Sequence, residues 1–201
     1  MFMKLGIKDN KIHLDREKTA LDHFVIKFIK TLNVRYVIVS GYVSILFGRS
    51  RTTEDVDILI EKISLEKFRE AYSALKKAGF ESVTTENEKE LFDELDKEKS
   101  SIRFCEAGKY VPNMEIKFAK DMEDIAALTN AVDVMFKGDT IKISPLEMQI
   151  AYKLFLGKEG NEKDIEDARH LYGLFKDSLN KQKLNEWMKH LNVTKMVKYL
   201  G

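Results

Sequence analysis

Residues 51–60 (RTTEDVDILI) combine acidic side chains with a run of β-forming residues. Along a strand, successive side chains point to opposite faces, so Asp55 and Asp57 share one face while Val56 and Ile58 point to the other. Two like charges roughly 6–7 Å apart repel each other unless a cation or solvent lies between them. Carboxylate oxygens are the ligands that Mg²⁺ and Mn²⁺ prefer. The pattern therefore predicts a divalent-cation site, and an exposed strand end that carries acids is the alternative interpretation.

The segment before these acids, YVIVSGYVSILFG, has the order of a strand, a small-residue turn and a short helix. Ser40 and Gly41 form the predicted turn. A helix that starts after such a turn presents backbone N–H groups that can bind a phosphate. A phosphate cradle and a cation site would then lie on neighbouring strands.

This stretch resembles the nucleotidyltransferase superfamily of the polymerase β type, whose motif is Gly-Gly or Gly-Ser, a spacer, and then DxD. It is most similar to the abortive-infection-like toxin and antitoxin branch, with the pattern GG.A...G..R.T.DID. The counterparts in this sequence are Ser40, Gly41, Gly48, Arg51, Thr53, Asp55 and Asp57. Serine thus stands at the first glycine of the pattern. The resemblance implies that an NTP binds with Mg²⁺ or Mn²⁺ and that Ser40 and Gly41 contact phosphate; Arg51 would do the same or pair with Glu54.

The superfamily also supplies a third carboxylate from a later strand, between apolar residues. In the segment NMEIKF, Glu115 has this setting, where the family usually has aspartate. The resemblance therefore implies a catalytic metal set of Asp55, Asp57 and Glu115. Asp133, in AVDVMF, is a rival for the third position. An ion pair of Glu115 with a neighbour such as Lys117 or Arg103 is the non-catalytic interpretation.

The C-terminal segment ISPLEMQIAYKLFLGKEGNEKDIEDARHLY is similar to the family pattern h.spE.lI..K..A.....KD..D...L. Lys153 shares a helical face with the apolar Ile150, so its charge needs a counter-charge or a route to water. A nucleotide triphosphate would supply that charge, and snorkelling to solvent is the alternative. Asp164 and Asp167 fall in the first turns of the next helix, where acids favour the helix dipole; in the family such acids hold the lysine or the far wall of the site.

The elements that must position these residues indicate an α/β (α+β) protein, a mixed sheet flanked by helices with a C-terminal helical bundle. Helices are expected at 16–32 with Asp15 as N-cap, at 42–48, from Ser64 to Gly79, from a capping box of Thr85 and Glu88, and at 145–156, 162–176 and 181–192. Strands are expected at 36–40, 54–60, 101–106, 110–118 and in a hairpin over 131–144. We expect residues 1–144 to form a nucleotidyltransferase-like domain and residues 145–201 a helical part packed on it.

The composition excludes several classes of protein. The formal net charge is +1, so no long-range field favours a nucleic-acid or membrane partner. A single cysteine, Cys105, excludes an intramolecular disulfide, and no signal peptide or apolar span is evident, so we expect a cytoplasmic protein.

The resemblance implies transfer of a nucleoside monophosphate from an NTP to an acceptor hydroxyl of RNA or protein, in a toxin–antitoxin system. The alternative is a catalytically weakened binding module, for instance an antitoxin-like partner of another protein.

Overall fold

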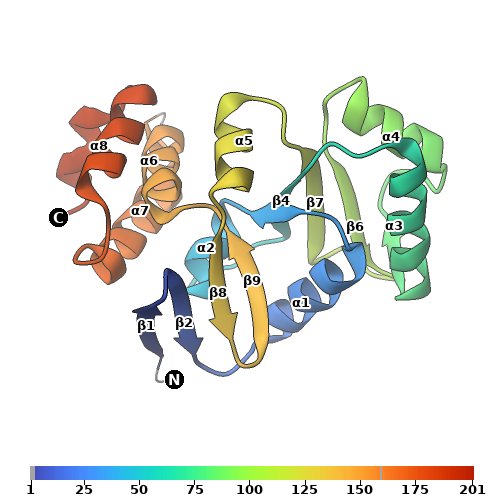
Figure 1. Cartoon of the computed structure of the whole chain (residues 1–201), viewed down its shortest axis with the longest axis horizontal. Helices are drawn as coiled ribbons and strands as arrows, with labels where there is room; N and C mark the ends of the chain where they lie inside the picture. Colours follow the sequence, from blue (N-terminus) through green and yellow to red (C-terminus); the bar gives the residue numbers. More distant parts are fainter. Residues whose placement is uncertain (1–2, 159) are drawn as a thin grey trace.

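The computed structural model describes residues 3–158 and 160–201 (Figure 1). Its strands form one nine-stranded mixed sheet in the order β1-β2-β8-β9-β3-β4-β7-β6-β5. The strands are Lys4–Lys8 (β1), Lys11–Asp15 (β2), Tyr36–Ile38 (β3), Asp55–Ile60 (β4), Phe80–Ser82 (β5), Ile102–Glu106 (β6), Asn113–Phe118 (β7), Val132–Phe136 (β8) and Asp139–Ile143 (β9). The helices are Ala20–Leu32 (α1), Gly41–Leu46 (α2), Leu65–Lys77 (α3), Glu88–Asp96 (α4), Met122–Thr129 (α5), Leu146–Gly157 (α6), Glu162–Phe175 (α7), Lys181–His190 (α8) and the 3-10 helix Thr194–Tyr199 (η1).

The alternation predicted for the acid-bearing strand is present in β4. Ile58 is buried in the larger core, together with Ile116 of β7 and residues of α1 and α3. Leu59, on the opposite face, packs with Ala127 and Leu128 of α5 in a second core. In Figure 1, α5 accordingly lies apart from α1 and α3. The acids of β4 share the face of Leu59, because side chains two residues apart along a strand point the same way.

The register between strands brings the candidate residues together. β4 runs parallel to β7, and Asp55 lies opposite Asn113 while Asp57 lies opposite Glu115. On its other side β4 pairs antiparallel with β3, and the backbone N–H of Val39 donates to the Asp57 carbonyl at 3.0 Å. The turn that follows β3 therefore lies beside the acids of β4.

The C-terminal helices pack on the segment after β3. The ring of Phe47, at the end of α2, meets Phe175 of α7 edge-on with centroids 4.8 Å apart. Gly157 at the end of α6 allows α7 to approach, because a Cβ there would lie 2.4 Å from Cγ1 of Ile165. The predicted mixed sheet with a C-terminal helical bundle is confirmed, and the division at residue 144 stays a prediction. None of the described helices has the length and apolar character needed to cross a membrane.

Two predicted helix caps were wrong. α1 begins later than expected: Thr19, not Asp15, is its N-cap, because residues up to Asp15 belong to β2. α4 is capped by Asn87, whose side chain accepts from two backbone N–H groups, while the Thr85 hydroxyl donates to Glu90. The cap of α3 by Ser64 is confirmed.

Other elements were not predicted. The β1–β2 hairpin turns at Asp9 and Asn10, both with positive φ, a two-residue turn that is a known hairpin signal. α5 was also not predicted; it buries Ala127 and Leu128, whereas its apolar Met122 and Ile125 are exposed. β5, only three residues long, was also missed.

A buried ion pair ties α1 to the segment that carries the candidate site. Asp22 is fully buried and accepts from the Arg16 guanidinium at 2.7 and 2.9 Å and from the Tyr42 hydroxyl of α2 at 2.8 Å. It also completes the capping box with Thr19. The pair therefore fixes the start of α1 and the position of α2 at once.

Replacing Asp22 by Asn should lower the free energy of unfolding by about 3 kcal/mol or more, because the buried Arg16 charge would lose its counter-charge. Thr19→Ala, which removes the cap but keeps the ion pair, should cost only about 1 kcal/mol. Urea unfolding at neutral pH measures both. Equal losses in the two variants would contradict a role for the ion pair beyond capping.

Candidate functional site

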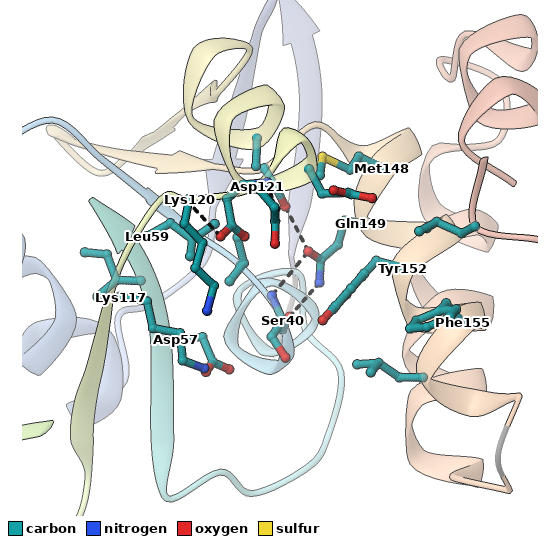
Figure 2. A pocket seen from close by; sticks show the side chains of 18 residues that line it. Ser40, Asp57, Leu59, Lys117, Lys120, Asp121, Met148, Gln149, Tyr152 and Phe155 are labelled. Carbon is teal, nitrogen blue, oxygen red and sulfur yellow. Dashed lines mark hydrogen bonds between the residues drawn. The ribbon is translucent and has the colours of Figure 1, made fainter. Parts of the chain in front are cut away.

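The turn after β3 is held in an unusual conformation. Ser40 has a φ of 62° and a ψ of −135°, a region that glycine adopts readily and serine does not. The amide of Gln149 on α6 donates to the Ser40 carbonyl at 2.7 Å and accepts from its N–H at 3.2 Å. The Ser144 hydroxyl donates to the same amide oxygen at 2.8 Å. Figure 2 shows this clamp, which the sequence did not predict.

Asp57 points into a cavity of about 470 Å³ between the sheet, α5 and α6. Burial raises the pKa of the Asp57 carboxyl above its ordinary value; Lys117 and the Ser40 hydroxyl lower it, whereas the carboxylates of Glu115 and Asp55 raise it further. A buried carboxylate whose pKa is raised in this way gains stability from a cation. The Asp55 and Asp57 oxygens therefore fit a hard divalent ion.

Glu115 lies beside Asp57, but its two carboxylate oxygens are already paired. Oε2 accepts from Arg103 at 2.8 and 3.0 Å, and Oε1 pairs with Lys117 at 2.8 Å. Burial raises the pKa of Glu115, but the hydrogen bonds from Lys117 and Arg103 lower it more, to about 2. As it stands, Glu115 fits a metal ion less well than Asp57 does. Across the described residues, no three His, Cys, Asp or Glu side chains are arranged as a metal site.

Lys153 is buried and does not snorkel to solvent; its predicted contact with a triphosphate stays a prediction. Its side chain is 2 % exposed, and Nζ lies 2.5 Å from Asp164 and 3.1 Å from Asp167 of α7. A longer contact of 3.4 Å reaches the Ser40 hydroxyl. The acids thus hold the lysine, as the resemblance implied, and the lysine holds α7 against the Ser40 turn.

Arg51 contacts one of the two acids that bind Lys153. It pairs with Asp167, which also binds Arg49 at 2.6 Å, and not with Glu54, the partner weighed from the sequence. A Cβ on Gly41 would lie 3.0 Å from a terminal nitrogen of Arg51, so the guanidinium lies directly against this glycine. Arg51 therefore borders the predicted phosphate cradle.

Asp133, the rival third acid, lies outside the site. It is on β8 and pairs with Lys142 at 2.6 Å and with Lys11 at 3.7 Å. β9 and β3 separate its strand from β4 in the sheet. Glu115 is thus the later-strand acid that lies beside the DxD pair.

The cavity continues from Asp57 toward α6. Tyr152 and Phe155 of α6 form part of its wall, with ring centroids 6.1 Å apart, and Figure 2 shows Tyr152 pointing from α6 toward Ser40. Lys117 and Lys120 line the opposite side. The cavity therefore offers both aromatic surface and positive charge next to the acids.

Comparison with solved structures agrees with this architecture. The solution structure of the antibiotic-resistance factor ANT(2'')-Ia superposes with a TM-score of 0.54 at 15% identity over 88% of this chain and 93% of that one. The nucleotidyltransferase-like antigen of Paracoccidioides brasiliensis gives a TM-score of 0.52 at 18% identity over 88% of each chain. ANT(2'')-Ia in complex with adenylyl-2''-tobramycin gives 0.52 at 15% identity, over 86% of this chain and 95% of that one.

The chain has the nucleotidyltransferase fold. No protein-family model matches the chain, and no curated protein matches it in sequence. The predicted fold is therefore confirmed, and the assignment to the toxin and antitoxin branch stays a prediction.

The conformation of Ser40 predicts an order of stability among its variants. Ser40→Gly should be more stable than Ser40→Ala by about 1 kcal/mol, because alanine keeps the strained backbone and glycine relieves it. Ser73, exposed in the middle of α3, is the matched control: there the alanine variant should be more stable than the glycine variant by a similar amount. Urea unfolding measures the two variants at each position. If the same residue, glycine or alanine, were the more stable at both positions, the strain at Ser40 would be contradicted.

Glu115 should make stability depend on pH. A fall in its pKa from 4.5 to about 2 corresponds to roughly 3 kcal/mol. Since the folded-state pKa is depressed, this stability is present above the unfolded pKa and is lost as the pH falls toward 2. Glu115→Gln should therefore be less stable than the wild type by about 3 kcal/mol at pH 7, and the gap should close on acidification. Urea unfolding measures the difference in the free energy of unfolding between the two proteins at each pH. A difference that stays constant between pH 7 and pH 3 would rule this out.

Proposed function

We propose that this protein transfers a nucleoside monophosphate from an NTP to an acceptor hydroxyl and releases pyrophosphate. The observation that carries the proposal is the pair Asp55 and Asp57, presented on one face of β4 beside the Ser40–Gly41 turn and at the edge of a cavity. Its fold, shared with nucleotidyltransferases, supports the same reaction.

The residues take distinct roles in this proposal. Asp55 and Asp57 hold Mg²⁺ or Mn²⁺, which when bound neutralises charge on the phosphates and on the leaving pyrophosphate. Ser40 and Gly41 contact phosphate, and Arg51 supplies positive charge next to them. Lys153 acts through Ser40, which it contacts from within the protein. Direct binding of an ion by Glu115 competes with its pairs to Arg103 and Lys117.

In this proposal, which follows the resemblance to the toxin and antitoxin branch, the acceptor is a hydroxyl of RNA or of protein in a cytoplasmic toxin–antitoxin system with a cognate partner. The structure of ANT(2'')-Ia contains adenylyl-2''-tobramycin, which adds a small-molecule acceptor as a class to be tested. The cavity next to Asp57, at about 470 Å³, is within the usual size of small-molecule sites.

A second candidate function is a nucleotide-binding module with weakened catalysis. The pairing of both Glu115 oxygens favours it, since a carboxylate that is neutralised by two cations is a poor base. Such a protein would bind an NTP without turning it over.

Label transfer separates the two candidates. The purified protein is incubated with Mg²⁺, each α-phosphate-labelled NTP, and in turn bulk RNA, cell protein or tobramycin. The proposal predicts labelled acceptor for at least one pair, and Asp57→Ala should reduce the rate by about a hundredfold or more, the upper end of effects at metal sites.

Asp133→Ala is the matched control, because it removes an acid from β8 outside the site and should leave the rate unchanged. Nucleotide binding, followed by thermal stabilisation with Mg²⁺ and NTP, decides what a negative transfer result means. Thermal stabilisation without label transfer supports the binding module. The absence of both stabilisation and transfer at millimolar NTP would refute both functions.

A further inference from the structure

Asn113 begins β7 directly beside the candidate cation site. It pairs in register with Asp55 and lies two residues before Glu115, so its side chain shares the face of both acids. The residue is only 8 % exposed. A polar side chain that is buried at such a place needs hydrogen-bond partners or a ligand.

The orientation of this amide is fixed by one hydrogen bond. Nδ2 of Asn113 donates to the carbonyl of Glu54 at 3.2 Å. The opposite orientation would place two acceptor oxygens against each other, so the nitrogen must face Glu54. Oδ1 is then left buried and without a hydrogen-bond partner among the residues that the structure describes. An unsatisfied buried carbonyl costs about 1–3 kcal/mol.

Both carboxylate oxygens of Glu115, in contrast, already have a cationic partner. Arg103 and Lys117 each pair with a different oxygen of its carboxylate, at 2.8 Å in both cases. Coordination by Glu115 would bring a cation against an oxygen whose charge Arg103 or Lys117 already neutralises. Coordination by Asn113 would meet no such competing cation.

We propose that Asn113 Oδ1, and not Glu115, is the third protein oxygen that binds the divalent cation held by Asp55 and Asp57. This inference rests on the proposed cation site and deepens it. A neutral amide oxygen is a normal ligand for Mg²⁺, Mn²⁺ and Ca²⁺ and adds no further negative charge to the two carboxylates. Glu115 then serves as a positioning residue, which holds Lys117 at the edge of the cavity.

Mn²⁺ binding to the full chain without nucleotide tests this assignment, with free Mn²⁺ measured by electron paramagnetic resonance. Asn113→Ala should weaken Mn²⁺ affinity by about tenfold or more. Asn113→Asp should bind Mn²⁺ at least as tightly as the wild type. Both variants lose the hydrogen bond to Glu54, so the difference between them reports the oxygen at position 113 together with the charge that aspartate adds.

Two further variants complete the design. Glu115→Gln should lower the Mn²⁺ affinity less than Asn113→Ala does, since it removes a charge beside the site but no ligand. Asn130→Ala, at the exposed end of α5, is the matched asparagine control and should leave the affinity unchanged. Melting temperatures in EDTA confirm that each variant is folded under the conditions of the titration.

The outcomes are decisive. A large loss of Mn²⁺ affinity in Glu115→Gln, with none in Asn113→Ala, would assign the third ligand to Glu115 and overturn the inference. So would the absence of Mn²⁺ binding by the wild type at millimolar concentration, or equal affinities of the Ala and Asp variants at position 113. Failure of label transfer with normal Mn²⁺ binding would refute the transferase activity and leave the cation site standing.

Discussion

The parallel pairing of β4 with β7 is the constraint on which the candidate site depends. Its register places Asp55 beside Asn113 and Asp57 beside Glu115, so that three acids and an amide share one face of two adjacent strands. Hydrogen bonds between strands fix this register, and a slip of either strand by one residue would turn the polar side chains of that strand to the opposite face, where Ile58 and Ile116 are buried. The crowding of negative charge is therefore built into the backbone and must be compensated by other groups.

The chain compensates these charges in two different ways. Glu115 receives its cations from the protein, Arg103 from β6 and Lys117 from its own strand. Asp57 has no equivalent pair within the described part of the chain, and its pKa is raised by burial and by the other carboxylates. In the proposed site, the protein therefore neutralises Glu115 and a diffusible cation neutralises Asp57. The three acids are then not equivalent ligands.

The sequence was informative wherever a local pattern decides the structure. Strand alternation correctly separated the acids of β4 from Ile58. The lysine on an apolar stripe was expected to need a counter-charge or a route to water, and Asp164 supplies a counter-charge, while the contact with a triphosphate stays a prediction. The clamp by Gln149 could not be predicted, because it joins residues 109 positions apart and depends on how α6 docks. The unpaired oxygen of Asn113 depends likewise on the pairing partner of β7.

The conformation of Ser40 shows how the C-terminal helices contribute to the site. A glycine, which the sequence pattern has at this position, would adopt a φ of 62° without strain, whereas serine requires support from its surroundings. Gln149 supplies this support through two backbone hydrogen bonds, and Lys153 contacts the hydroxyl that serine adds. Both residues come from α6, so the shape of the turn is coupled to the docking of that helix. Because serine stands where the sequence pattern has glycine, the conformation of the turn beside Asp57 depends on α6 as well as on the sheet.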